Sequence, residues 1–338
     1  MSTEFDADAK EAALRAESES WDMSNVADAV EGDIPVIDIS AYLASGSDDD
    51  LDKIAADLAR ACETVGFWQL VGHGIPQETL QEIFAAVRDF HALPIEVKEK
   101  VRMDRADWAL SGVGYLPVFS RKLPSRATGN LNEAFLVKGD RDISSDDNQW
   151  PPSVDAPDFR ATVERFASLL EGLAVQLLPV YAVALGLPRD WFDAAFEHPF
   201  WRLRMTHYPP DHSVRSTDDE YGIAPHVDTT FFTLLLQDSP GLTIYSHVRD
   251  RWLKVPVVED AFVVNSGELL KQWTNDRYLS VRHFANVEGT DSRYSIPFFV
   301  NATRDFKMEC IPTCTDADNP AKYPAISYNE SQAVVQGE

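Results

Sequence analysis

A histidine and an aspartate of this chain stand at a spacing that can bind a metal ion. His226 and Asp228 are two positions apart at the end of a strand-like run, just after Pro225. Residues i and i+2 of a strand point to the same face, so an imidazole and a carboxylate can share one interior. The pair alone is weak evidence, because with eight histidines about one such triplet arises by chance. Taken alone, a surface histidine beside a turn aspartate is the commoner explanation.

A third ligand comes from a second strand-like run. His283 lies within the segment Tyr278–Val287. Two neutral imidazoles and one carboxylate on one side of a metal leave coordination positions open, which suits Fe(II) and O₂ chemistry. A structural zinc site, in contrast, is closed by four protein ligands. Without its two companions, His283 would be interpreted as a core or edge histidine.

An arginine and a serine follow at the same two-residue spacing. Arg293 and Ser295 come soon after His283. A guanidinium binds a carboxylate through two parallel hydrogen bonds, and a serine hydroxyl adds a third donor. A buried guanidinium needs an anion, so the pair predicts carboxylate recognition if it faces inward; the opposite orientation stays open. Thr206 and Tyr208 form another such pair, which could place two hydroxyls on the same wall.

The elements that must position these residues divide into two regions of one compact unit. Residues 33–200 are predicted to be mixed and mostly helical, and residues 201–330 to form a β core. In the first region the expected strands are 34–40, 66–74 and 132–137, and the expected helices are 50–65, 77–92, 158–185 and a short one after Pro188. In the second region the expected strands are 201–208, 223–228, 231–237, 242–246, 252–254, 261–265, 278–287 and 293–301. The fold class is therefore mainly β with flanking helices, built on a sandwich, barrel or jelly roll.

The charge of the chain argues against several kinds of partner. The formal net charge is −25 over 338 residues, and an acidic surface repels nucleic acid and anionic membranes. Residues 1–32 hold much of the acidic excess and are predicted to be a solvated, flexible extension. No apolar run approaches transmembrane length, and the N-terminus lacks the pattern of a signal peptide. The oligomeric state is not predicted.

The cysteine content indicates a reducing compartment. The chain has three cysteines, Cys62, Cys310 and Cys314. An odd number in a chain of this length predicts free thiols and a cytoplasmic location. Cys310 and Cys314 stand four apart but have no further ligand-like partners, so they are interpreted as incidental thiols rather than a metal site.

Taken together, the ordered motifs resemble the iron- and 2-oxoglutarate-dependent oxygenases of the isopenicillin N synthase-like family. The resemblance runs from about Ile34 to Tyr328. It rests on the segments Ile34–Asp38, Gly66–Gly74, His226–Asp228, Asp260–Asn265, Ser280–His283 and Arg293–Pro297. It implies a double-stranded β-helix, or jelly-roll, core wrapped by N-terminal helices.

The resemblance also assigns roles to residues. It implies that Fe(2+) is bound by His226, Asp228 and His283. It implies that Arg293 and Ser295 hold the distal carboxylate of the cosubstrate 2-oxoglutarate, and that Tyr208 assists them. Thr206 stands where the family commonly has asparagine, so its part in cofactor binding does not follow from the family pattern.

The activity implied by the resemblance is that of a dioxygenase. Such an enzyme uses Fe(2+), O₂ and 2-oxoglutarate to hydroxylate, desaturate or cyclise a small-molecule metabolite, with release of succinate and CO₂. No side-chain acid or base is needed beyond the metal ligands. The candidate substrate contacts are aromatic residues, at least half of which are expected to be core: Tyr115, Phe119, Phe231, Phe232 and Phe299. Arg121, Lys122 and Arg126 flank the same N-terminal segment and could meet an acidic group.

Three alternatives remain open from the residues. An oxidase of the isopenicillin N synthase type needs no 2-oxoglutarate, and its Arg-x-Ser pair can bind a substrate carboxylate. A non-catalytic small-molecule-binding protein could share the fold, although it need not keep all three ligands. A zinc hydrolase with two histidines and a carboxylate would leave Arg293 and Ser295 without a role.

Overall fold

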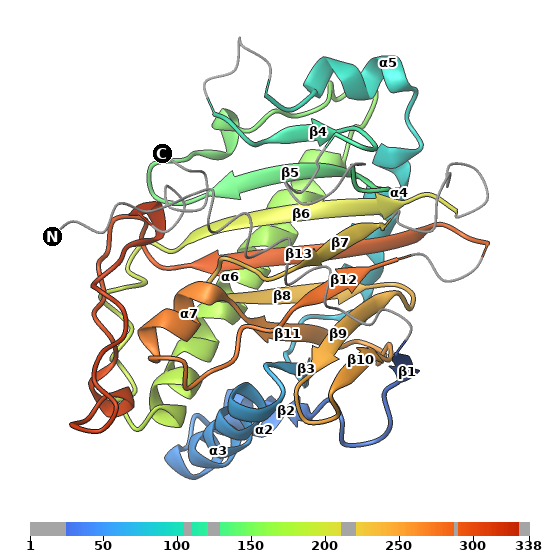
Figure 1. Ribbon diagram of the computed structural model, residues 1–338. Coiled ribbons are helices and arrows are strands. Elements are labelled where there is room, and N and C mark those ends of the chain that lie inside the picture. Colours follow the sequence, from blue (N-terminus) through green and yellow to red (C-terminus); the bar gives the residue numbers. More distant parts are fainter. Residues whose placement is uncertain (1–24, 105–109, 121–128, 211–220, 287–289, 331–338) are drawn as a thin grey trace, which may run out of the picture.

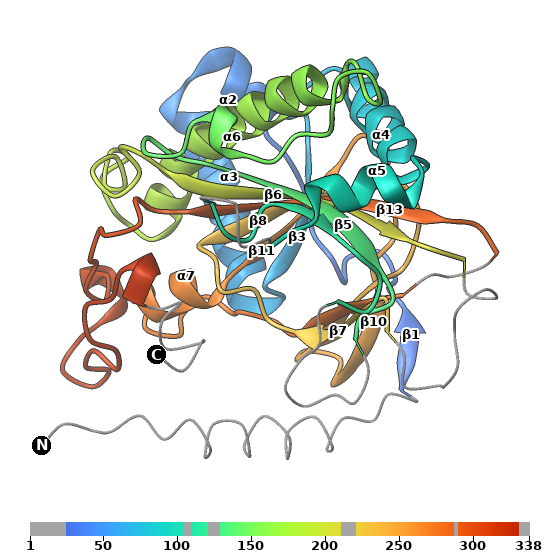
Figure 2. The same ribbon diagram turned by 90° about the horizontal axis from the view of Figure 1, so that it is seen from above.

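Two β-sheets face each other, and helices cover the outer face of the larger one (Figures 1 and 2). The computed structural model describes residues 25–104, 110–120, 129–210, 221–286 and 290–330. The larger sheet contains, in order, β2 (Val36–Asp38), β3 (Phe67–Val71), β11 (Phe262–Ser266), β8 (Phe232–Gln237), β13 (Arg293–Asn301), β6 (Phe200–Tyr208), β5 (Glu133–Gly139) and β4 (Gly114–Leu116). The smaller sheet contains β1 (Val26–Asp28), β10 (Arg251–Lys254), β9 (Leu242–Ser246), β12 (His283–Ala285) and β7 (Ile223–His226).

From β6 onward the chain passes back and forth between the two sheets. β6, β8, β11 and β13 belong to the larger sheet, and β7, β9, β10 and β12 to the smaller one. This alternation builds a double-stranded β-helix, the jelly-roll core expected from the sequence. One side of each strand therefore faces the space between the sheets, where a site can form.

The helices are α2 (Ser40–Ser45), α3 (Asp48–Thr64), α4 (Gln77–His91), α5 (Ile95–Lys98), α6 (Phe159–Ala184) and α7 (Glu268–Trp273), with 3₁₀ turns at Glu99–Val101, Ser145–Asp147 and Pro312–Cys314. The longer helices α3, α4 and α6 form an apolar layer on the larger sheet. Figure 2 shows α4 and α6 on the side of the larger sheet opposite β7 and β10. Helix α3 starts where the Ser47 side chain accepts a hydrogen bond from the Asp50 amide, a standard N-cap. Its apolar face then packs against α6.

Helix α6 is the central helix of the apolar layer. It is 26 residues long, and among the described residues it is the one helix whose length and composition would also allow it to cross a membrane. In the fold, 56% of its most apolar window is buried, against α3, α4 and the sheet. The sequence expectation of no apolar run of such length was therefore wrong, and the burial identifies α6 as a core helix.

Residue alternation along β13 separates the core from the cavity. Ile296, Phe298 and Val300 belong to the apolar core under the helices. Arg293 and Ser295, one position out of phase, line a cavity between the sheets. The inward orientation that the sequence left open is thus the one found.

Most expected elements are present, but α2, α5 and β4 were not predicted, the strand expected at 278–287 is confined to His283–Ala285, and further elements differ. The predicted helix after Pro188 is a series of turns, and the short helix α7 was not predicted. The extension predicted for residues 1–32 is too long, because β1 pairs in parallel with β10. A strand of three residues shows almost no alternation in the sequence. The acidic composition of this region therefore determined the prediction. Residues 1–24 lie outside the described part of the chain.

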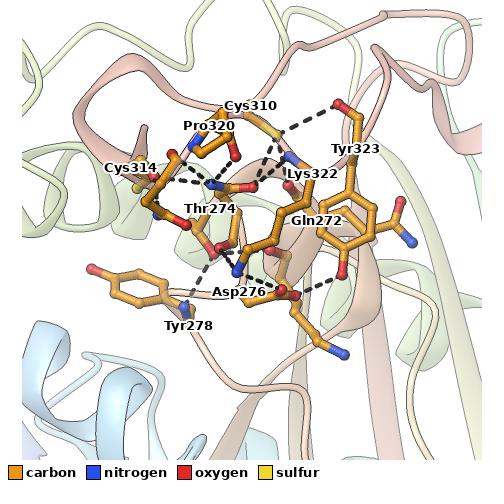
Figure 3. A network of polar contacts seen from close by, with 12 residues as sticks. Gln272, Thr274, Asp276, Tyr278, Cys310, Cys314, Pro320, Lys322 and Tyr323 are labelled. Atoms are coloured by element: carbon orange, nitrogen blue, oxygen red, sulfur yellow. Dashed lines mark hydrogen bonds and ion pairs between the residues drawn. The ribbon is translucent and has the colours of Figure 1, made fainter. Parts of the chain in front are cut away.

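A polar network fastens the C-terminal segment to the end of α7 (Figure 3). Asn275 is buried, and its Nδ2 atom donates to the carbonyl oxygens of Cys314, Asn319 and Pro320 at 3.3, 3.4 and 3.2 Å. Its Oδ1 atom accepts from the Lys322 amide at 2.9 Å. Cys310 and Cys314 are free thiols within this network.

Candidate metal centre

The two candidate histidines are direct neighbours across two strands. His226 is the last residue of β7 and His283 the first of β12, and they are paired in the antiparallel register. Their ring centroids are 4.3 Å apart. The Oδ1 atom of Asp228 lies 3.7 Å from Nε2 of His226 and 3.8 Å from Nε2 of His283. Three potential ligand atoms therefore converge on one point.

Backbone carbonyls orient both imidazoles. Nδ1 of His226 lies 2.9 Å from the Ala224 carbonyl oxygen, and Nδ1 of His283 lies 3.1 Å from that of Val281. A carbonyl can only accept, so each Nδ1 carries the hydrogen and donates it. Each Nε2 then presents a lone pair toward the other ligands, as metal binding requires.

Hydrogen bonds also orient the carboxylate. Thr233 Oγ1 and Asn265 Nδ2 both donate to Oδ2 of Asp228, at 2.7 and 2.9 Å. Oδ2 is thereby occupied, while Oδ1 is the atom directed at the imidazoles. The set of two nitrogens and one oxygen on one side, with space on the other, fits Fe(II) better than a closed zinc site.

The electrostatics keep the ligands in their metal-binding forms. Burial lowers the pKa of His226 to about 4, and the nearby His283 and the Arg204 guanidinium contribute. His226 is therefore neutral at physiological pH. Burial opposes ionisation of Asp228, but His283, His226 and the two hydrogen bonds outweigh it and lower the pKa of this carboxyl group.

A buried arginine stands beside the metal ligands in the same cavity. Arg293 is 2% exposed, and its guanidinium carbon lies 4.7 Å above the Tyr208 ring. The Tyr208 hydroxyl is 3.2 Å from Oγ of Ser295. Within the described residues, Nη1 of Arg293 has no hydrogen-bond partner. A buried, positively charged donor without a partner is costly. A cofactor carboxylate could accept hydrogen bonds from this donor and from the hydroxyl groups of Tyr208 and Ser295.

The cavity between the sheets has a volume of about 560 Å³, which suits a cosubstrate and a small metabolite. Besides the metal ligands its wall includes Ser120, Asn130, Arg204, Phe284 and Phe299. Arg204 is largely buried; its Nη2 donates to Asn132 Oδ1 at 2.6 Å and its Nε to Thr206 Oγ1 at 3.2 Å.

Several expected contacts lie elsewhere. Phe231 and Phe232 are fully buried among Tyr181, Phe192 and Trp273 under the helices, away from the cavity. Their expected role as substrate contacts was wrong, because their side chains belong to the apolar layer.

Two further expectations are corrected in the same way. Tyr115 packs on Phe90 in the apolar layer and donates to Glu133. The Thr206 hydroxyl accepts from Arg204 and is not part of the cavity wall. Phe119 is 39% exposed beside the cavity residue Ser120 without lining the cavity itself.

Phe299 does line the cavity, and its contact with a substrate stays a prediction. Arg121, Lys122 and Arg126 lie outside the described residues.

A second group of histidines surrounds a carboxylate on the helix side of the sheet. His91, Glu133 and His207 have potential ligand atoms within 4.8 Å of one another. The Glu133 carboxylate, however, already accepts from His207 at 2.8 Å and from the Lys98 ammonium at 2.9 Å. A buried ammonium beside the carboxylate repels a metal cation, so this group is a structural polar cluster.

Sequence reasoning missed the residues that hold the ligands in place. Asn265 was noticed only as part of the motif Asp260–Asn265, and Thr233 and Arg204 were not singled out. Arg204 could have been found from the sequence, because it is four positions before Tyr208 and residues an even number of positions apart in a strand share one face. Which residue of β11 meets Asp228 depends on the pairing of β11 with β8, which the sequence does not display.

Comparison with known proteins agrees with this geometry. The model of the non-haem dioxygenase N-terminal region, described for morphine synthesis, matches residues 34–153. The model of the 2OG-Fe(II) oxygenase superfamily matches residues 200–302. The chain belongs to the 2OG-Fe(II) oxygenase superfamily and is a 2-oxoglutarate-dependent dioxygenase acting on a small molecule.

Its relatives include fungal enzymes. The 2-oxoglutarate-dependent dioxygenase tropC of Talaromyces stipitatus is 30% identical, over 82% of this chain and 88% of that protein. The 2-oxoglutarate-Fe(II) type oxidoreductase hxnY of Emericella nidulans is 32% identical, over 88% of this chain and 87% of that protein. The crystal structure of a full-length Neurospora crassa protein in complex with alpha-KG has a TM-score of 0.80 at 25% identity, covering 93% of this chain and all of that chain. These relatives favour the 2-oxoglutarate-dependent reaction over the oxidase, binding-protein and hydrolase alternatives.

Proposed function

We propose that His226, Asp228 and His283 bind the catalytic Fe(II), and that Arg293, Ser295 and Tyr208 bind the distal carboxylate of 2-oxoglutarate. The convergence of two oriented Nε2 atoms and Oδ1 of Asp228 carries the first assignment. The unpartnered Nη1 of Arg293 beside two hydroxyls supports the second. Bound iron, together with O₂ and 2-oxoglutarate, would supply the oxidant for a C–H bond of the substrate, and 2-oxoglutarate would be converted to succinate and CO₂.

The protein's own residues orient the reactants and exclude water. The carbonyls behind both imidazoles and the donors behind Asp228 fix the ligand directions before the metal binds, which lowers the reorganisation needed. Apolar residues such as Phe67, Leu235 and Phe284 form much of the cavity wall, so the reacting centre is largely dry.

For the substrate, we propose a small metabolite that carries a carboxylate. Arg204 supports this assignment, since its guanidinium lines the cavity on β6 and its charge contributes to the low pKa of His226. A guanidinium this close to the metal centre favours an anionic or acceptor group on the substrate. Phe299 and Phe284 offer apolar surface for the remainder.

An anaerobic Fe(II) titration tests the metal assignment. The wild-type protein is expected to bind one Fe(II), and addition of 2-oxoglutarate should produce a visible charge-transfer band. His226→Ala should weaken Fe(II) binding by about 100-fold or more, because one of three ligands is lost. The matched control is His247→Ala, since His247 is exposed at the turn between β9 and β10. If His226→Ala bound Fe(II) as tightly as His247→Ala, the metal assignment would be wrong.

The substrate assignment has its own test. Small carboxylic acids and their amides would be compared for stimulation of O₂ uptake and succinate formation. The acids should stimulate the wild type more than the amides do, and Arg204→Met should lose this preference while its basal turnover of 2-oxoglutarate persists. Equal stimulation by acids and amides in the wild type would reject the proposed substrate class.

We also propose that the protein works in the cytoplasm. Its three cysteines are all free thiols, which supports a reducing compartment. Fractionation of the source cells, with the protein detected by antibody, tests this location.

A further inference from the structure

A glutamine on a neighbouring strand contacts the guanidinium of the cofactor-binding arginine. Gln237 is the last residue of β8 and is paired across the strands with Ser295 of β13. Its Oε1 atom accepts a hydrogen bond from Nη2 of Arg293 at 3.0 Å. Gln237 is 7% exposed and is not among the residues that line the metal cavity. The hydrogen bond to Nη2 of Arg293 is therefore the contact that links Gln237 to the cofactor-binding residues.

The amide of Gln237 has only one orientation that suits this contact. Nη2 of Arg293 is a donor, so it requires the carbonyl oxygen of the amide and not its nitrogen. The Nε2 atom of Gln237 has no partner among the described residues. A buried amide that leaves its own donor unsatisfied is unfavourable for stability, which indicates that the contact with Arg293 determines its placement.

Three contacts fix the guanidinium and leave one nitrogen over. Nε donates to the Ser239 carbonyl at 3.2 Å, Nη2 to Gln237, and the plane lies over the Tyr208 ring. Nη1 is the nitrogen without a partner within the described residues. An arginine side chain has about 2 kcal/mol of rotamer entropy to lose, and fixing it in advance reduces that loss when a ligand binds.

We propose that Gln237 is a positioning residue for 2-oxoglutarate: it holds the Arg293 guanidinium in the plane that directs Nη1 toward the distal carboxylate. This inference rests on the proposed function, in which Arg293 binds that carboxylate. Gln237 affects cofactor affinity and the selection of the cofactor, and it does not touch the iron or the substrate.

Gln237→Met provides the test, because methionine has a similar volume and cannot accept the hydrogen bond. Loss of one charge-assisted bond should weaken 2-oxoglutarate binding by about tenfold. The affinity would be measured anaerobically from the visible band of the Fe(II) complex, and the KM for 2-oxoglutarate should rise in parallel. The kcat at saturating 2-oxoglutarate and the affinity for Fe(II) should stay within about twofold of the wild type.

A second ligand separates positioning from loss of structure. 2-Oxopentanoate has the chain length of 2-oxoglutarate but no distal carboxylate, so its weaker binding does not depend on Arg293. The preference for 2-oxoglutarate over 2-oxopentanoate should fall about tenfold in Gln237→Met, whereas general damage would weaken both ligands alike. The matched control is Gln69→Met, since Gln69 is a buried glutamine of β3 that donates to the Pro256 carbonyl and does not contact Arg293. Its preference should equal that of the wild type.

Arg293→Met distinguishes the failure of this inference from that of the proposed function. If Arg293→Met kept full affinity for 2-oxoglutarate, the cofactor assignment itself would be wrong. If Arg293→Met lost affinity while Gln237→Met kept both the affinity and the preference, only the positioning role would be rejected.

Discussion

The Nδ2 atom of Asn265 lies 2.9 Å from Oδ2 of Asp228, the carboxylate oxygen that is not directed at the imidazoles. Oδ1 is the atom directed at Nε2 of His226 and His283. Thr233 donates to the same Oδ2 atom. Asn265 and Thr233 therefore divide the carboxylate into one oxygen held by the protein and one left for the metal.

Removing the hydrogen bond from Asn265 should weaken metal binding without removing a ligand. Asn265→Leu leaves Oδ2 of Asp228 with one donor, so the carboxylate can rotate away from its metal-binding direction. Outer partners of metal ligands typically change affinity 10–100-fold, and we expect a loss of about tenfold or more in Fe(II) affinity by anaerobic titration. Asn301→Leu is the control, because Asn301 is buried in β13 and makes no hydrogen bond to Asp228. Equal Fe(II) affinities in the two variants would contradict the role of Asn265.

A side chain at Gly241 should disturb the arginine that binds the cofactor. A Cβ atom there would lie 2.1 Å from the Asn286 carbonyl oxygen and 2.8 Å from Nε of Arg293, and the φ angle is +144°. Gly241→Ala should therefore reduce both the free energy of unfolding and the affinity for 2-oxoglutarate. Gly46→Ala is the control: its φ is +62° and nothing lies within 4 Å, so about 1 kcal/mol of strain is expected. Urea unfolding measures the stability of both variants, and titration with 2-oxoglutarate measures their cofactor affinity. If both variants lost the same stability and the same affinity, no clash at Gly241 would be needed to explain them.

Much of the metal site could be predicted because its signals are local. The spacing of His226 and Asp228, and of Arg293 and Ser295, follows directly from the two-residue period of a strand. The bounds of β13 and α6 also agree with the sequence prediction, since long runs carry the strongest periodicity. The family resemblance then selected the jelly roll from the all-β folds that composition allowed.

The parts that could not be predicted depend on which strands become neighbours. Phe231 and Phe232 have the composition of cavity aromatics, but the helical layer covers them. Asn265 and Gln237 act on Asp228 and Arg293 only because β11, β8 and β13 are adjacent in the sheet. Strand order is set by packing of the whole chain, and residue spacing does not encode it.

The buried Glu133 cluster should make stability depend on pH. Burial opposes ionisation of Glu133, but hydrogen bonds from His207 and Tyr115 and the nearby His91 ring outweigh it, so the pKa of this carboxyl group is lowered. A lowered pKa in the folded state stabilises the protein above the unfolded value of about 4.3. That contribution is lost as the pH falls below this value.

Glu133→Gln tests this dependence. At pH 7 the variant should be less stable by about 3 kcal/mol, because one partner of a buried ion pair with Lys98 is removed. The difference in melting temperature from the wild type should shrink as the pH is lowered from about 5 to about 2, because the unfolded state then takes up a proton that the folded Glu133 does not. Glu99→Gln removes an exposed pair with Arg102 and should have a small effect, under about 1 kcal/mol. A difference that stayed constant with pH would show that Glu133 is not ionised in the folded protein.

The network at Asn275 should control the attachment of the C-terminal segment. Asn275→Asp keeps the size of the side chain, the acceptor for the Lys322 amide and tolerance of the positive φ of 53°. It replaces the amide donor that binds three carbonyl groups by an oxygen that they repel. We expect a loss of about 3 kcal/mol in the free energy of unfolding and faster cleavage between residues 303 and 330 in limited proteolysis. Glu309→Gln, an acid-to-amide exchange at an exposed side chain of the same segment, should be cleaved at the wild-type rate; equal cleavage of both variants would mean that Asn275 does not hold the segment.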